Sequence, residues 1–160
     1  MAGVVRTYLS LMREIAEGLT LTPLDVMARQ PGIVMVYRVT VRYHDRRVRD
    51  SAATLIQRRM DVWALEVAYR GAFDGKPIQY PITMARGTAF AAALTGQGFD
   101  RLLDAPDLPP YPSADLVLIE RAAGTFYHSV IVSMTTAVEP YTRIVNAVRN
   151  GLPEALKQVK

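Results

Sequence analysis

The sequence predicts an α+β fold, in which hairpins form an antiparallel sheet with helices packed on one face and an amphipathic helix at the N-terminus. Three observations support this fold class. The chain of 160 residues opens with a helical period of apolar side chains, changes to a period of two near residue 33, and has turn residues between its later alternating segments. Half of the residues are hydrophobic and 21% are charged, as in an ordinary globular core.

The first 32 residues predict two helices. Apolar side chains recur with a helical period over residues 4–19, opposite a polar face that carries both signs of charge. Thr22, Pro23 and Asp25 then have the spacing of a helix start, so a second short helix is expected up to about residue 29. We expect the first helix to pack on its own domain, with docking on another chain as the alternative.

The next segments predict hairpins. Residues 33–44 alternate between apolar and polar side chains, as a strand does, and a polar turn follows over 45–51. Residues 52–60 fit either a strand or a helix, and we interpret them as the returning strand of a hairpin. Residues 62–70 alternate again, and Asp74-Gly75 is a hairpin turn signal before a strand over 76–83.

The second half predicts two further helices and a second hairpin. An alanine-rich helix is expected over 85–94, followed by an extended, proline-rich connection over 106–112. A second hairpin is expected from strands over 115–121 and 125–134, and a helix that follows Pro140 and ends at Gly151. We divide the chain into residues 1–61, as an extension or as part of the same domain, and an α+β domain over 62–160.

Several kinds of chemistry have no support in the sequence. Cysteine is absent, which excludes disulfides and thiolate nucleophiles and is typical of a cytoplasmic protein, the location that we expect. There is no secretory signal pattern and no apolar run of the ~20 residues that a spanning helix needs. His44 and His128 form no metal motif. We therefore expect no metal, no cofactor and no catalytic residue, and we leave enzymatic activity open.

The positive charge is concentrated near the N-terminus. Residues 1–61 contain ten arginines and six acidic residues, whereas residues 62–160 contain nine basic and nine acidic residues. The candidate anion-binding residues are Arg38, Arg42, Arg46, Arg47 and Arg49. Such a patch could bind nucleic acid non-specifically. We favour the interpretation that these charges solvate the edge and tip of a hairpin.

Residues 62–150 resemble the emfourin family, small bacterial proteins that include inhibitors of thermolysin-like metalloproteases. The segment Leu65-Glu66-Val67-Ala68-Tyr69-Arg70-Gly71-Ala72-Phe73-Asp74-Gly75 is similar to the first strand and glycine-rich loop of that family, and Gly98-Phe99-Asp100-Arg101-Leu102 is similar to its helix exit. The resemblance implies a protein-binding loop made of Arg70, Gly71, Ala72, Phe73, Asp74 and Gly75, with a metalloprotease as the partner.

These observations lead to three functional hypotheses. The first is a non-catalytic protein-binding domain, either an emfourin-like protease inhibitor or an accessory subunit of a larger complex. The second is a small-ligand-binding protein or enzyme, with a site made of dispersed residues such as Tyr37, Arg42, His44 and Glu66. The third is a basic nucleic-acid-binding module. The oligomeric state is left open.

Overall fold

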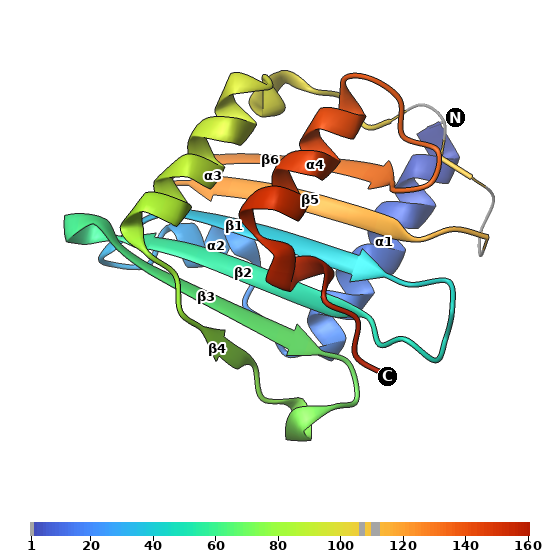
Figure 1. Cartoon of the computed structure of the whole chain (residues 1–160), viewed down its shortest axis with the longest axis horizontal. Coiled ribbons are helices and arrows are strands. Elements are labelled where there is room, and N and C mark those ends of the chain that lie inside the picture. Colours follow the sequence, from blue (N-terminus) through green and yellow to red (C-terminus); the bar gives the residue numbers. More distant parts are fainter. Residues whose placement is uncertain (1, 106–107, 110–112) are drawn as a thin grey trace.

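The structure, a computed structural model, describes residues 2–105, 108–109 and 113–160. Within these ranges six strands form one antiparallel sheet in the order β4-β3-β2-β1-β5-β6 (Figure 1). The strands are β1 (Ile33–Arg42), β2 (Ser51–Arg58), β3 (Val62–Tyr69), β4 (Ile78–Tyr80), β5 (Leu116–Ala123) and β6 (Phe126–Ser133). The predicted α+β class with an antiparallel sheet of hairpins is confirmed.

The hairpin over residues 33–58 lies at the centre of this sheet. β2 pairs with β1 from Val41 and Ser51 to Ile33 and Arg58, so the strand interpretation of residues 52–60 is confirmed up to Arg58. β2 also pairs with β3, and β1 pairs with β5. Residues 1–61 and 62–160 therefore contribute strands to the same sheet. The predicted extended connection over 106–112 lies largely outside the described residues.

Helices cover both faces of the sheet. On one face lie α3 (Met84–Gly96) and α4 (Tyr141–Gly151), and on the other lie α1 (Ala2–Gly18) and α2 (Leu24–Ala28) (Figure 1). The N-terminal amphipathic helix packs on its own domain, because its apolar side chains Tyr8, Met12 and Ile15 are buried against the sheet. No helix in the described part of the chain is long and apolar enough to cross a membrane.

The alternation of side chains along β1 divides its residues between the two faces. Tyr37 and Val39 belong to the main core beneath α3 and α4, whereas Val36 packs with α2 on the opposite face. Arg38 and Thr40 share the face of Val36, and both are buried. Because α1 and α2 pack on that face, Arg38 and Thr40 are enclosed inside the protein and do not point to solvent.

Candidate functional site

A row of polar side chains crosses all six strands on the face covered by α1 and α2. Each member is the register partner of the next on the neighbouring strand, from β4 to β6. The row consists, in order, of Gln79, Glu66, Thr54, Arg38, Glu120 and Ser129. We call this set the polar row.

The polar row lies between two separate apolar clusters. On one side α1 packs on a cluster that includes Ala52 and Leu118, and on the other side α2 packs on a cluster that includes Val36 and Ala122. Ala52 and Leu118 each lie two residues from the row along their strands, on the side of α1. Val36 and Ala122 each lie two residues from the row on the other side, under α2. The centre of the row therefore lies between the two areas of the sheet on which these helices pack.

Arg38 occupies the centre of the row and is almost fully buried, with 2% of its surface exposed. Its Nε donates to Thr54 Oγ1 at 3.1 Å, and its Nη1 donates to the carbonyl of Thr22 at 2.8 Å. Its Nη2 has no hydrogen-bond partner among the described residues. A buried guanidinium that lacks a partner at one nitrogen is costly, so this atom is a candidate contact for a ligand.

Glu120 lies opposite Arg38 on β5 and is also buried. Its Oε1 accepts a hydrogen bond of 2.6 Å from the hydroxyl of Tyr127 on β6. No ion pair forms between Glu120 and Arg38, although both residues are described and are direct register partners. Both side chains line the same pocket.

Burial controls the ionisation of this site. Desolvation raises the pKa of Glu120, and the hydrogen bond from Tyr127 and the charge of Arg38 oppose that rise. Burial, together with the negative charge of Glu120, raises the pKa of Tyr127 to about 12. A carboxyl group with a raised pKa next to a buried cation in a cavity is a common property of binding and catalytic sites.

A pocket of about 370 Å³ lies over this part of the row. Its size falls in the range of small-molecule sites, which combine apolar walls with a few polar groups. Its floor includes Arg38, Thr40 and Glu120, and the hydroxyl of Thr40 is buried without a hydrogen-bond partner among the described residues. The rest of the lining consists of Met12, Arg13, Ala16, Glu17, Leu21, Pro23, Leu24, Asp25, Arg29, Leu118, Thr125 and Tyr127.

The arginines expected to bind anions do not share one surface. Arg38 and Arg42 are buried, with 2% and 4% of their surfaces exposed, so the interpretation of these two as solvating charge is wrong. Arg46 pairs with the buried Asp50, and Arg47 pairs with Asp45. Arg49 Nη1 donates to the carbonyl of Arg70. Of this set, Arg38 alone lines the pocket.

The loop implied by the family resemblance lies between β3 and β4. Phe73 and Asp74 both have a φ of 55°, and the glycines Gly71 and Gly75 have φ values of 71° and 72°. This left-handed backbone leaves Phe73 half exposed, while its ring contacts that of Tyr69 with centroids 5.7 Å apart. Arg70 and Asp74 are exposed and Ala72 is half-buried. The loop therefore presents one aromatic side chain in part to solvent.

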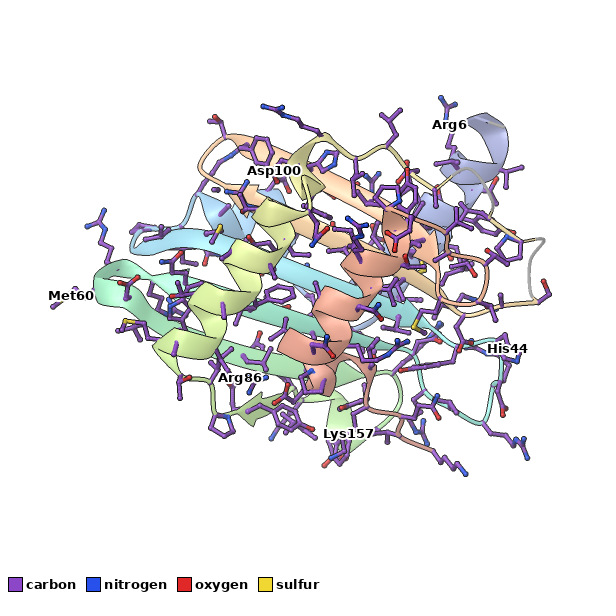
Figure 2. The ribbon with its side chains drawn as sticks, turned by 45° about the horizontal axis from the view of Figure 1, so that its top comes forward. Arg6, His44, Met60, Arg86, Asp100 and Lys157 are labelled. Atoms are coloured by element: carbon purple, nitrogen blue, oxygen red, sulfur yellow. The ribbon has the colours of Figure 1, made fainter. Side chains whose placement is uncertain are left out.

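The dispersed residues proposed for a ligand site are not brought together. Tyr37 lies in the core beneath α3 and α4, whereas Glu66 belongs to the polar row on the opposite face and accepts from Gln79. His44 lies at one end of the sheet, far from the hairpin tip at Met60 (Figure 2), and binds Asp115 through Nδ1 at 2.7 Å. In the ranges that the structure describes, no cluster of three or more His, Asp or Glu could hold a metal ion.

The polar row was not predicted from the sequence, although one local pattern indicates part of it. Glu120 follows Leu116-Val117-Leu118-Ile119, an apolar run typical of a strand buried on both faces. An acidic residue at the end of such a run indicates a buried carboxyl group. Nothing local indicates that Glu120 lies opposite Arg38, because the two residues belong to strands that are far apart along the chain.

No model of a known protein family matches the chain, and no curated protein matches it.

Proposed function

We propose that this chain binds a small ligand in the pocket between α1, α2 and the sheet. The observation that carries the proposal is the arrangement of Arg38 and Glu120, which are both buried, lie opposite each other in register and form no ion pair. Burying two ionisable groups costs free energy that a good mutual contact can offset. Here that contact is missing, and a ligand between the two groups would provide it.

The rest of the pocket supports the same proposal. Apolar side chains such as Met12, Leu24 and Leu118 line its walls, and the unpartnered hydroxyl of Thr40 adds a third polar group at its floor. A fold alone does not define a function, so the proposal depends on these groups and not on the α+β class. A role in binding requires no catalytic residue, and none is assigned.

Fragment screening by ligand-observed NMR tests this proposal with a pocket-filling variant. Ala16 lines the pocket from α1, and Ala16→Trp would fill much of the space. Ala89→Trp is the matched control, because Ala89 is exposed on α3 on the other face of the sheet. We expect the fragments that bind the wild type and the control to lose binding in Ala16→Trp. Equal binding of the same fragments by all three folded proteins would overturn the proposal.

A second proposal concerns protein binding through the loop over residues 70–75. Its support is the half-exposed ring of Phe73, which a left-handed backbone holds at the turn between β3 and β4. Exposed aromatic side chains are common anchors of protein interfaces. With the resemblance to the emfourin family, this favours a thermolysin-like metalloprotease as the partner. An inhibition assay with purified protein tests it, and no inhibition at micromolar concentration would contradict it.

A further inference from the structure

We propose that the ligand of this pocket is a monocarboxylate that carries a hydrogen-bond donor next to its carboxyl group and an apolar body. In this arrangement Arg38 Nη2 binds the carboxylate, Glu120 accepts from the adjacent donor, and the apolar walls enclose the body. The inference rests on the proposed function, since it names the chemical class of a ligand for the same pocket.

The guanidinium of Arg38 is held in place by hydrogen bonds at two of its nitrogens, and the third nitrogen has none among the described residues. Thr54 and the carbonyl of Thr22 hold its Nε and Nη1, so the plane of the group is set before any ligand arrives. Nη2 is left without a partner among the described residues. Arginine has no acceptor atom, so the group that completes Nη2 must accept a hydrogen bond. A carboxylate oxygen does this with a charge-assisted bond.

Glu120, in contrast, needs a hydrogen-bond donor from the ligand. Of the residues that the structure describes, Tyr127 is its hydrogen-bond partner, and that bond occupies Oε1. A ligand carboxylate bound to Arg38 would lie near the Glu120 carboxyl group, because the two residues are cross-strand neighbours. A hydroxyl or amino group beside the ligand carboxylate would donate a hydrogen bond to Glu120. This bond would offset the repulsion between the ligand carboxylate and the Glu120 carboxyl group.

The charges around the pocket limit the ligand to a single negative charge. Three arginines line it, and so do three acidic residues; the six are Arg13, Arg29, Arg38, Glu17, Asp25 and Glu120. A balanced lining provides no excess of positive charge for a dianion such as a phosphate monoester. The burial that raises the pKa of Glu120 also disfavours a second negative charge beside it.

The walls of the pocket specify the rest of the ligand. Met12, Ala16, Leu21 and Leu24 come from α1, the α1–α2 connection and α2, and Leu118 comes from β5. These side chains can cover an aromatic or branched aliphatic group. A volume of about 370 Å³ accommodates a body of that size together with the carboxylate and its donor.

Calorimetric titration with four matched probes tests the inference. The probes are 2-hydroxy-3-phenylpropanoate, 3-phenylpropanoate, 2-phenylethylamine and 2-phenylethylphosphonate. We expect the hydroxy acid to bind roughly tenfold tighter than the plain acid, since a hydrogen bond to a buried carboxyl group is added. We expect no saturable binding of the amine and weaker binding of the phosphonate.

Two variants assign the contacts. Arg38→Met should weaken both acids roughly a hundredfold, because it removes a charge-assisted contact. Glu120→Gln keeps an oxygen for the Tyr127 hydroxyl, and the preference for the hydroxy acid over the plain acid should fall toward one. Circular dichroism checks the fold of each variant. If Arg38→Met does not fold, the ratio of the affinities of Glu120→Gln for the two acids tests the inference alone.

The outcomes separate this inference from the proposed function. Tighter binding of the amine or the phosphonate, or failure of all four probes while fragments still bind in the pocket, overturns the inference and leaves the pocket as a ligand site. Failure of the probes together with fragment binding that Ala16→Trp does not affect overturns both. An equal affinity for the two acids contradicts the role given to Glu120.

Discussion

The indole ring of Trp63 on β3 lies directly against Gly87 in the first turn of α3. A Cβ atom at position 87 would lie 2.4 Å from Trp63 Cδ2 and 2.5 Å from Cε3, far inside van der Waals contact. Glycine inside a helix usually costs stability relative to alanine. Here the missing side chain lets α3 approach β3, and the close packing of an aromatic ring explains why the helix contains a glycine at this point.

We therefore expect Gly87→Ala to destabilise the protein, although alanine is the better helix former. The gain in helix propensity is about 1 kcal/mol, and overpacking against a ring costs typically about 1–3 kcal/mol. The control is Gly96→Ala in the same helix, where nothing lies within 4 Å of an added Cβ, and which should be neutral or slightly stabilising. Urea titration followed by the fluorescence of Trp63 measures both. A Gly87→Ala protein as stable as Gly96→Ala would contradict this packing.

The raised pKa of Glu120 predicts how stability changes with pH. The unfolded chain releases the Glu120 proton near the ordinary value of 4.5, whereas the buried group in the folded protein holds it to higher pH. Between the two pKa values the folded state binds more protons, so the contribution of Glu120 to the free energy of unfolding decreases as pH rises. Glu120→Gln lacks this titration.

We expect the stability of Glu120→Gln relative to wild type to increase from about pH 4 upward and to become constant above the folded pKa of Glu120. Denaturant titrations of both proteins between about pH 4 and pH 8 measure the difference. A difference that does not change over this range, or that changes in the opposite direction, would show that Glu120 is not desolvated.

Asp50 is a buried anchor of the turn between β1 and β2. Its carboxylate, 1% exposed, accepts from the backbone N–H of Tyr43 at 3.1 Å and from both terminal nitrogens of Arg46. Asp50→Ala should cost about 2–4 kcal/mol of stability, mainly because the Tyr43 N–H loses its acceptor. Asp50→Asn, which keeps an acceptor oxygen, should lose less.

Asp45 in the same turn is the matched control for Asp50. It also pairs with an arginine, Arg47, but at the surface, so Asp45→Ala should change stability little. Thermal unfolding of the three variants beside wild type measures the series. Equal losses for Asp50→Ala and Asp45→Ala would mean that burial of Asp50 has no energetic role.

Phe73→Ala tests whether Phe73, in the turn between β3 and β4, contributes to protein binding or to the packing of the core. Phe73 is half exposed, so the substitution should cost less than about 1 kcal/mol of stability, in contrast to the roughly 3–5 kcal/mol typical of a core phenylalanine. If the loop binds a metalloprotease, the same change should weaken inhibition by about 2 kcal/mol, as at an aromatic hot spot. Unchanged inhibition by a folded Phe73→Ala protein would exclude this loop as the anchor.

The fold was predictable where the signal is local. The alternation of residues 33–44, the Asp74-Gly75 turn and the helical period of residues 4–19 depend on neighbouring residues, and each of these elements is present in the structure. The strand identity of residues 52–58 comes from pairing on both sides, with β1 and β3, and this long-range pairing is not visible in the segment itself.

The candidate site was not predictable in the same way. Arg38 on an alternating strand normally indicates a face turned to water, because an antiparallel sheet often has one solvated face. In this protein α1 and α2 cover that face, so the same pattern places a guanidinium in the interior. The polar row depends on the register of six strands, which comes from long-range pairing and not from any one segment.

Crystallographic fragment screening gives the sharpest test of ligand binding in this pocket, because it locates bound ligands whatever their chemistry. We predict that bound fragments gather between α1, α2 and the sheet, with acceptor atoms at Arg38 Nη2 and donor atoms at Glu120. The groove between α3 and α4, about 570 Å³ in volume and lined by Arg86, Arg143 and Asn146, is the internal comparison. Fragments that occupy this groove and leave the Arg38 pocket without a ligand would contradict ligand binding between α1, α2 and the sheet.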